Sequence, residues 1–189
     1  MLISELRQAM ETDVKRQIRK WELIGIAVIA GVGAVLHFAF EWSGELRAVA
    51  VFAAVNESVW EHLKLTYWPA LLYAALEYRK IRNLSDNFIA AKAAGIYVMP
   101  AAIIALFYAY TTITGSDNLI ADITIFVVAI ALGQLTSYKI LTLPSLSRRL
   151  YILAIIGLVA LGVLFTLFTF HPPQVPMFRD PVSGAYGIP

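Results

Sequence analysis

The sequence predicts an all-α, polytopic membrane helical bundle with about five transmembrane helices and an interfacial N-terminal amphipathic helix. Three observations lead to this fold class. Hydrophobic residues make up 59% of the 189-residue chain and charged residues only 15%, whereas soluble domains contain about 45–50% apolar and about 25% charged residues. Apolar stretches long enough to cross a bilayer recur along the chain. Basic residues gather at alternate ends of these stretches, as the positive-inside rule requires.

Residues 1–21 are expected to form an amphipathic helix on the cytoplasmic surface of the membrane. Glu5, Glu11 and Asp13 exclude a cleavable signal peptide, whose core is apolar and uncharged. Basic side chains lie between apolar residues that recur at helical spacing, which is typical of an interfacial helix. These apolar residues are Leu6, Met10, Val14, Ile18 and Trp21.

Residues 22–170 are expected to form a transmembrane domain of five spans. A helix rises about 1.5 Å per residue, so about 20 residues cross a hydrocarbon core of about 30 Å. Pro69 predicts a kink in the second span, and Pro100 lies near the middle of the third. The apolar run 46–55 is too short to span and predicts a short re-entrant or surface helix. The five expected spans are residues 23–42, 58–78, 88–110, 119–141 and 150–170.

The distribution of lysine and arginine predicts the orientation. Twelve of the fifteen basic residues fall on one side of this topology. The protein is therefore expected in the cytoplasmic (inner) membrane with its N-terminus inside. The tail of residues 171–189, which contains five prolines, is expected outside as an extended or turn-rich segment.

Lys92 and Lys139 lie about one turn inside their helices, and their side chains are expected to reach the interface. The pattern predicts no carboxylate in the central layer of the membrane.

Composition narrows the classes of function. The absence of cysteine excludes disulfides, thiolate metal sites and cysteine nucleophiles. The formal net charge of +2, without a basic run, argues against binding of nucleic acid. The expected partners are the lipid bilayer and a substrate that the sequence does not identify. A second copy of the chain, in a homo-oligomer, is left open.

Ionisable residues gather at the predicted outer ends of the spans, and such groups in a membrane need a partner or a function. His37 and Glu41 are four residues apart and share one face of the first helix. Histidine and carboxylate side chains are ligands for zinc, iron or manganese, so the expected cofactor is a divalent metal such as zinc. The candidate ligands are His37, Glu41, Glu57, His62 and His171.

Glu57 and Glu61 are the candidate catalytic residues, because a metal with an open coordination position activates water and a carboxylate can act as general base. Two simpler interpretations remain. Ser58-Val59-Trp60-Glu61 also fits a capping box, in which Glu61 only binds backbone N–H groups. The pair of His37 and Glu41 also fits an intrahelical hydrogen bond. No H-E-x-x-H motif occurs. Other polar residues expected at this end are Asn56, Asp122, Asp180 and Tyr186.

The ten residues from Asn56 to Leu65, NESVWEHLKL, form a specific string. With several shorter segments, it resembles an uncharacterised prokaryotic membrane family that is catalogued as a domain of unknown function, number 6512. The resemblance extends from the first helix to the tail. It implies a small multi-spanning protein of the cytoplasmic membrane, and it implies no activity. The shorter segments are residues 37–38, 41–42, 172–173, 178–181 and 186–187.

Three hypotheses of function follow from the pattern. The first is a membrane enzyme, a metal-assisted hydrolase of lipid-linked or lipid-proximal substrates. The second is a transporter or binding protein for a small solute or ion that uses the same outer polar cluster. The third is a structural accessory subunit without catalysis, in which the cluster only holds helices together. Elemental analysis of the purified protein, together with a structure that shows whether the three histidines converge, is the most informative observation for choosing between them.

Overall fold

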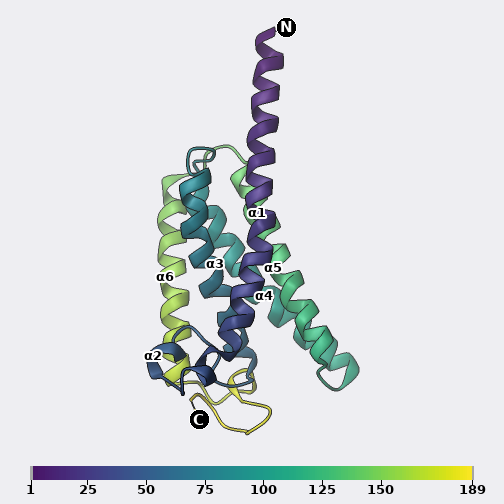
Figure 1. Ribbon diagram of the computed structural model, residues 1–189, viewed down its shortest axis with the longest axis vertical. Helices are drawn as coiled ribbons and strands as arrows, with labels where there is room; N and C mark the ends of the chain where they lie inside the picture. Colours follow the sequence, from purple (N-terminus) through teal and green to yellow (C-terminus); the bar gives the residue numbers. More distant parts are fainter. Residues whose placement is uncertain (1, 189) are drawn as a thin grey trace.

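The computed structural model describes residues 2–188, and throughout this range the regular secondary structure is helical. One isolated antiparallel bridge, between Arg179 and Tyr186, lies in the tail. The all-α prediction is therefore confirmed (Figure 1). The helices are α1 (Leu2–Trp42), α2 (Arg47–Ala50), α3 (Val59–Ile81), α4 (Phe88–Thr114), α5 (Leu119–Leu141), α6 (Arg148–Phe170) and the 3-10 helix η1 (Pro176–Phe178).

Four of these helices, α1, α4, α5 and α6, are long and apolar enough to cross a membrane. Helix α3 has 23 residues, the same length as α5 and α6. It is less apolar because it carries Glu61, Lys64 and Glu77, all of which are buried inside the bundle. A helical membrane bundle is therefore supported, and the assignment of α3 as a fifth span stays a prediction.

The predicted interfacial helix and the predicted first span form one unbroken helix, α1, of 41 residues. Residues 2–42 contain no proline, which would interrupt the helix. The first turns of α1 project beyond the rest of the bundle (Figure 1). Ile18 is only 1% exposed and packs against α3, α4 and α5. The bundle therefore begins before residue 22, and a surface position for the first turns stays a prediction.

Helices α1 and α3 run antiparallel in close contact. A Cβ atom at Gly33 of α1 would lie 2.6 Å from the carbonyl oxygen of Leu65 in α3, so only glycine permits this approach. The main apolar core lies around this contact, and its buried members come from α1, α3, α4, α5 and α6. The contact fixes which residues of α1 lie beside which residues of α3.

The chain folds over one end of the bundle, which we call the tail end. It is formed by the C-terminus of α1, the start of α3 and residues 171–188 (Figure 1). Phe178 is buried, and its ring centroid lies 4.7 Å from that of Trp60. The Asn56 side-chain amide donates to the carbonyl oxygen of Gly187 over 2.8 Å. The tail is turn-rich, as expected, and the short helix expected before Asn56 is α2.

A cysteine-labelling experiment tests the predicted orientation. The chain has no cysteine, so one introduced thiol is the only thiol. Gly115 has a φ of 77°, which strains other residues, so Ser116→Cys is the better probe of the α4–α5 loop. An impermeant maleimide added to intact cells should label Ser116→Cys. The matched variant Ser145→Cys, on the exposed α5–α6 loop, should react only after permeabilisation. The reverse pattern would invert the topology.

Candidate metal centre

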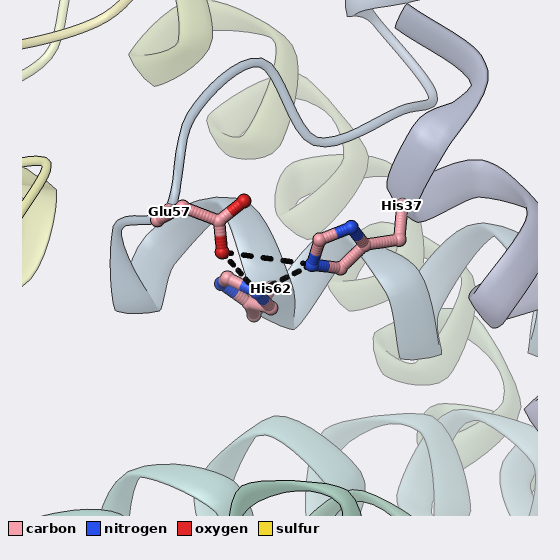
Figure 2. A group of neighbouring side chains, drawn as sticks. All are labelled: His37, Glu57 and His62. Atoms are coloured by element: carbon pink, nitrogen blue, oxygen red, sulfur yellow. Dashed lines mark hydrogen bonds and ion pairs between the residues drawn. The ribbon is translucent and has the colours of Figure 1, made fainter. Parts of the chain in front are cut away.

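His37, Glu57 and His62 form a compact group at the tail end (Figure 2). His37 belongs to the last part of α1, and His62 to the first turn of α3. Glu57 lies in the loop between α2 and α3, just before the N-cap residue Ser58. One ligand atom from each residue lies within 4.8 Å of the others. Two helices and one loop therefore bring together three of the five residues that the sequence suggested as ligands.

The distances in this group match three corners of a tetrahedral metal site. The two Nε2 atoms of His37 and His62 are 3.1 Å apart. Glu57 Oε2 lies 3.6 Å from the first and 3.5 Å from the second. A circle through the three atoms has a radius of about 2.0 Å, and zinc binds nitrogen and oxygen ligands at about 2.0–2.2 Å. An ion slightly out of their plane would reach all three without rearrangement.

The backbone of α3 orients the His62 ring. Its Nδ1 lies 2.9 Å from the carbonyl oxygen of Ser58, so Nδ1 carries the proton and donates to that oxygen. The unprotonated Nε2 then points towards the group. This is the arrangement in which metal-binding histidines are usually held. Ser58 is itself fixed, because its N–H donates to Asn56 Oδ1 over 2.9 Å.

The charge of the site comes from Glu57. The neighbouring His37 ring, followed by the His62 ring, lowers the pKa of this carboxyl and outweighs its partial burial. The carboxylate is therefore ionised at neutral pH, which is the form that binds metal. The side chain of Glu57 is 49% exposed, so one side of the group faces solvent. That side leaves room for a water or substrate ligand.

A metal-free arrangement also fits the contact between the two histidines. At 3.1 Å, one Nε2 can donate to the other as a hydrogen bond. His62 Nε2 is the acceptor in that case, because its Nδ1 holds the proton. His37 would then carry its proton on Nε2, and its Nδ1 is buried without a hydrogen-bond partner among the described residues. The two interpretations differ in whether a metal completes the group.

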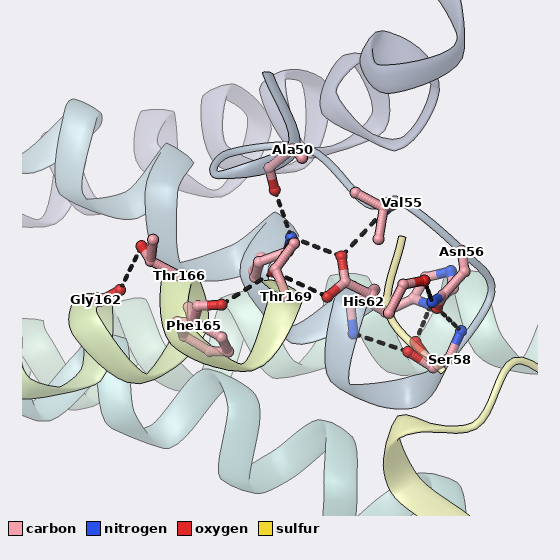
Figure 3. A network of polar contacts seen from close by, with 12 residues as sticks. Ala50, Val55, Asn56, Ser58, His62, Gly162, Phe165, Thr166 and Thr169 are labelled. Carbon is pink, nitrogen blue, oxygen red and sulfur yellow. Dashed lines mark hydrogen bonds and ion pairs between the residues drawn. The ribbon is translucent and has the colours of Figure 1, made fainter. Parts of the chain in front are cut away.

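The Glu61 side chain is 2% exposed and points away from the three potential ligands, into buried polar contacts around Ala50, Val55 and Thr169 (Figure 3). Its carboxylate pairs with Lys64 Nζ at 2.6 Å and accepts from the N–H of Val55 at 3.1 Å and from Thr169 Oγ1 at 3.1 Å. Lys64 also donates to the Ala50 carbonyl oxygen over 2.8 Å. The capping box is half formed. Ser58 Oγ accepts from the N–H of Glu61, but the Glu61 side chain binds Val55 and not Ser58. Glu61 is outside the group of potential ligands.

The other suggested residues lie apart from the three ligands. Glu41 is exposed one turn after His37, and His171 is exposed after the end of α6; neither belongs to the group. Asp122 accepts from the Tyr110 hydroxyl where α4 meets α5. Asp180 is bound by a turn of the tail through the N–H groups of Val182 and Ser183. Asn56 and Tyr186 take part in folding the loop and the tail.

The sequence analysis missed a second buried group, formed by Glu22, Glu77 and Lys92. Lys92 was expected to extend to the interface, but it is only 5% exposed and lies between the two carboxylates. The expectation that no carboxylate lies in the central layer of the membrane stays a prediction, because Glu22 and Glu77 are buried in the bundle but lie at one end of the predicted spans. A signal was present: three charged residues occur near the same end of three different spans. Inside a membrane such charges need partners.

A family model with the description "family of unknown function (DUF6512)" matches residues 10–188. This is almost the whole chain, so the chain belongs to that family. The search of curated proteins gave no match, and neither did the search of solved structures. The resemblance seen in the sequence is therefore confirmed, and the site has to be interpreted from its geometry.

The two neighbouring glutamates should differ in their effect on stability. Glu61→Gln leaves Lys64 buried without a counter-charge, which costs about 3–5 kcal/mol. Glu57→Gln alters an exposed side chain and should change stability by about 0.5 kcal/mol or less. Thermal unfolding of the metal-free protein in detergent measures both. Glu61→Gln combined with Lys64→Met should restore most of the loss, because it removes both charges. Equal midpoints for the two single variants would contradict the structural role of Glu61.

Proposed function

We propose that this member of the DUF6512 family binds one divalent metal ion, with zinc favoured, through His37, Glu57 and His62, and uses it to activate water. The observation that carries the proposal is the triangle of two Nε2 atoms and one carboxylate oxygen with sides of 3.1, 3.5 and 3.6 Å. Two histidines and one glutamate are the ligand set of a well-known class of catalytic zinc sites.

The half-exposed side of the group supports a catalytic site over a closed structural one. Structural zinc sites have four protein ligands, whereas catalytic sites keep a position for water or substrate. The group contains three potential ligands, and Glu57 faces solvent. A divalent metal held there supplies a bound water whose pKa is lowered to about 7. The protein contributes a fixed His62 tautomer, an ionised Glu57 and an open approach.

The surroundings of the site support a substrate at the membrane boundary. Phe38 and Trp42 follow His37 on α1, and their rings stack with centroids 5.6 Å apart. They are 48% and 69% exposed. Exposed aromatic rings of this kind are enriched at the level of lipid head groups. Hydrolysis of a lipid-linked or lipid-proximal substrate is the reaction class that this position favours.

Metal content is the direct test. Purified protein loaded with zinc and then desalted should retain about one ion per chain by elemental analysis. His37→Ala, His62→Ala and Glu57→Gln should each reduce this at least tenfold, because two remaining ligands hold zinc weakly. His171→Ala is the matched control, since it removes the third histidine of the chain, which lies outside the group. Retention of zinc by both His37→Ala and His62→Ala would contradict the proposed metal site. The contact of His37, Glu57 and His62 would then only hold α1 and α3 together.

A cobalt-substituted protein tests the open position. Co(II) at a site with three protein ligands and water should show visible absorption that shifts when a small hydroxamate replaces the water. The His171→Ala variant should respond identically. If the spectrum is that of a tetrahedral site and the hydroxamate leaves it unchanged, a fourth protein ligand closes the site. The metal would then be structural, and catalysis would be excluded there.

A further inference from the structure

A second ionisable group lies far from the metal centre, within the helix bundle. Lys92 Nζ of α4 lies 2.6 Å from Glu22 Oε1 of α1 and also forms an ion pair with Glu77 Oε2 of α3. Ser137 of α5 donates to the same Glu22 oxygen over 2.8 Å. Four helices therefore meet at these charges. The exposures of Glu22, Glu77 and Lys92 are 3%, 0% and 5%.

The group contains one more negative charge than positive charges. The groups that face it from the four helices are Glu22, Tyr73 and Glu77, Lys92, and the uncharged Gln134 and Ser137. Tyr73 donates its hydroxyl proton to the Trp21 carbonyl oxygen. Gln134 donates to the Glu22 carbonyl oxygen over 3.1 Å, not to a carboxylate. No second cation faces the group, so one buried carboxylate has no counter-charge among the described residues.

Three carboxylate oxygens of this group also lack a hydrogen-bond partner within residues 2–188, although one of them, Glu77 Oε2, is ion-paired with Lys92. Glu22 Oε2 and Glu77 Oε1 are buried and receive no donor from the described residues. An ionised carboxylate in such a place is costly, and buried groups of this kind take up a proton in preference to a net charge. The unpartnered oxygens and the excess charge are independent observations, and both indicate a missing proton donor.

We propose that Glu22, Glu77 and Lys92 form a proton-binding site that holds one exchangeable proton at neutral pH. The proton resides on Glu77, because the Glu22 anion is better stabilised. Glu22 accepts from both Lys92 and Ser137, whereas Glu77 is paired with Lys92 alone. With the proton bound, one carboxylate balances one ammonium group. The two carboxylates titrate as a unit, since each lies against the same lysine.

Infrared spectroscopy of the full-length protein tests the charge balance. The protein is purified in an ester-free detergent, so that the C=O stretch of a protonated carboxyl is not masked. The wild-type protein should show this band at neutral pH, shifted in D2O, and should lose it at high pH. Glu77→Gln and Glu22→Gln should each abolish the band, because the remaining carboxylate then pairs one-to-one with Lys92. Lys92→Met removes the cation, and the band should grow about twofold.

The buried pair of Glu61 and Lys64 provides the control. It has equal numbers of opposite charges, so the double variant Glu61→Gln/Lys64→Met should keep the wild-type band. Absence of the band in the wild-type protein at neutral pH overturns the proposal, and this measurement needs no variant to fold. A band that survives both Glu77→Gln and Glu22→Gln, or that only one of them removes, overturns it as well, because the proton would then not depend on the charge balance of the group.

Discussion

The antiparallel contact between α1 and α3 positions two of the ionisable groups of the protein. It places His37 beside His62 at one end and Glu22 with Glu77 around Lys92 at the other. Both helices take fifteen residues to pass from one group to the other, which corresponds to about 22 Å. The close approach at Gly33 holds this register. A shift of one residue would rotate the side chains by about 100° and separate both groups at once.

The long helices and their order could be predicted because hydropathy is a property of the sequence alone. Two consecutive antiparallel helices have the C-terminus of the first and the start of the second at the same end of the bundle, so His37 and His62 were expected at the same end. The direction of each side chain could not be predicted in the same way. Glu61 and His62 are adjacent and point about 100° apart on α3. Only His62 faces α1, while Glu61 faces Thr169 of α6.

Contacts between distant parts of the chain explain why the position of Glu57 and the burial of Lys92 could not be predicted from the sequence. The position of Glu57 depends on a loop that Asn56 ties to Gly187, at the far end of the sequence. Lys92 looked like an interfacial lysine because its partners lie on other helices, at Glu22 and Glu77. Hydropathy treats each charge separately, so it cannot show that three charges meet. For the same reason the hydropathy of α3 is lower than that of the other long helices, although Glu61, Lys64 and Glu77 are buried.

The three groups satisfy buried or half-buried charge in different ways, and the differences indicate their roles. Glu61 and Lys64 carry opposite charges that cancel, and both side chains are fully hydrogen-bonded. This pair needs no ligand to complete it, which indicates a structural role. The Glu22, Glu77 and Lys92 group is buried and has one excess negative charge. A single bound proton neutralises this charge, and it fits a closely packed site because it adds no heavy atom. The His37, Glu57 and His62 group is open to solvent on one side and its three potential ligand atoms lie 3.1–3.6 Å apart, which suits a metal ion with its own water. The two proposed ligands, a proton and a metal ion, therefore differ because the two sites differ in charge, burial and access to solvent.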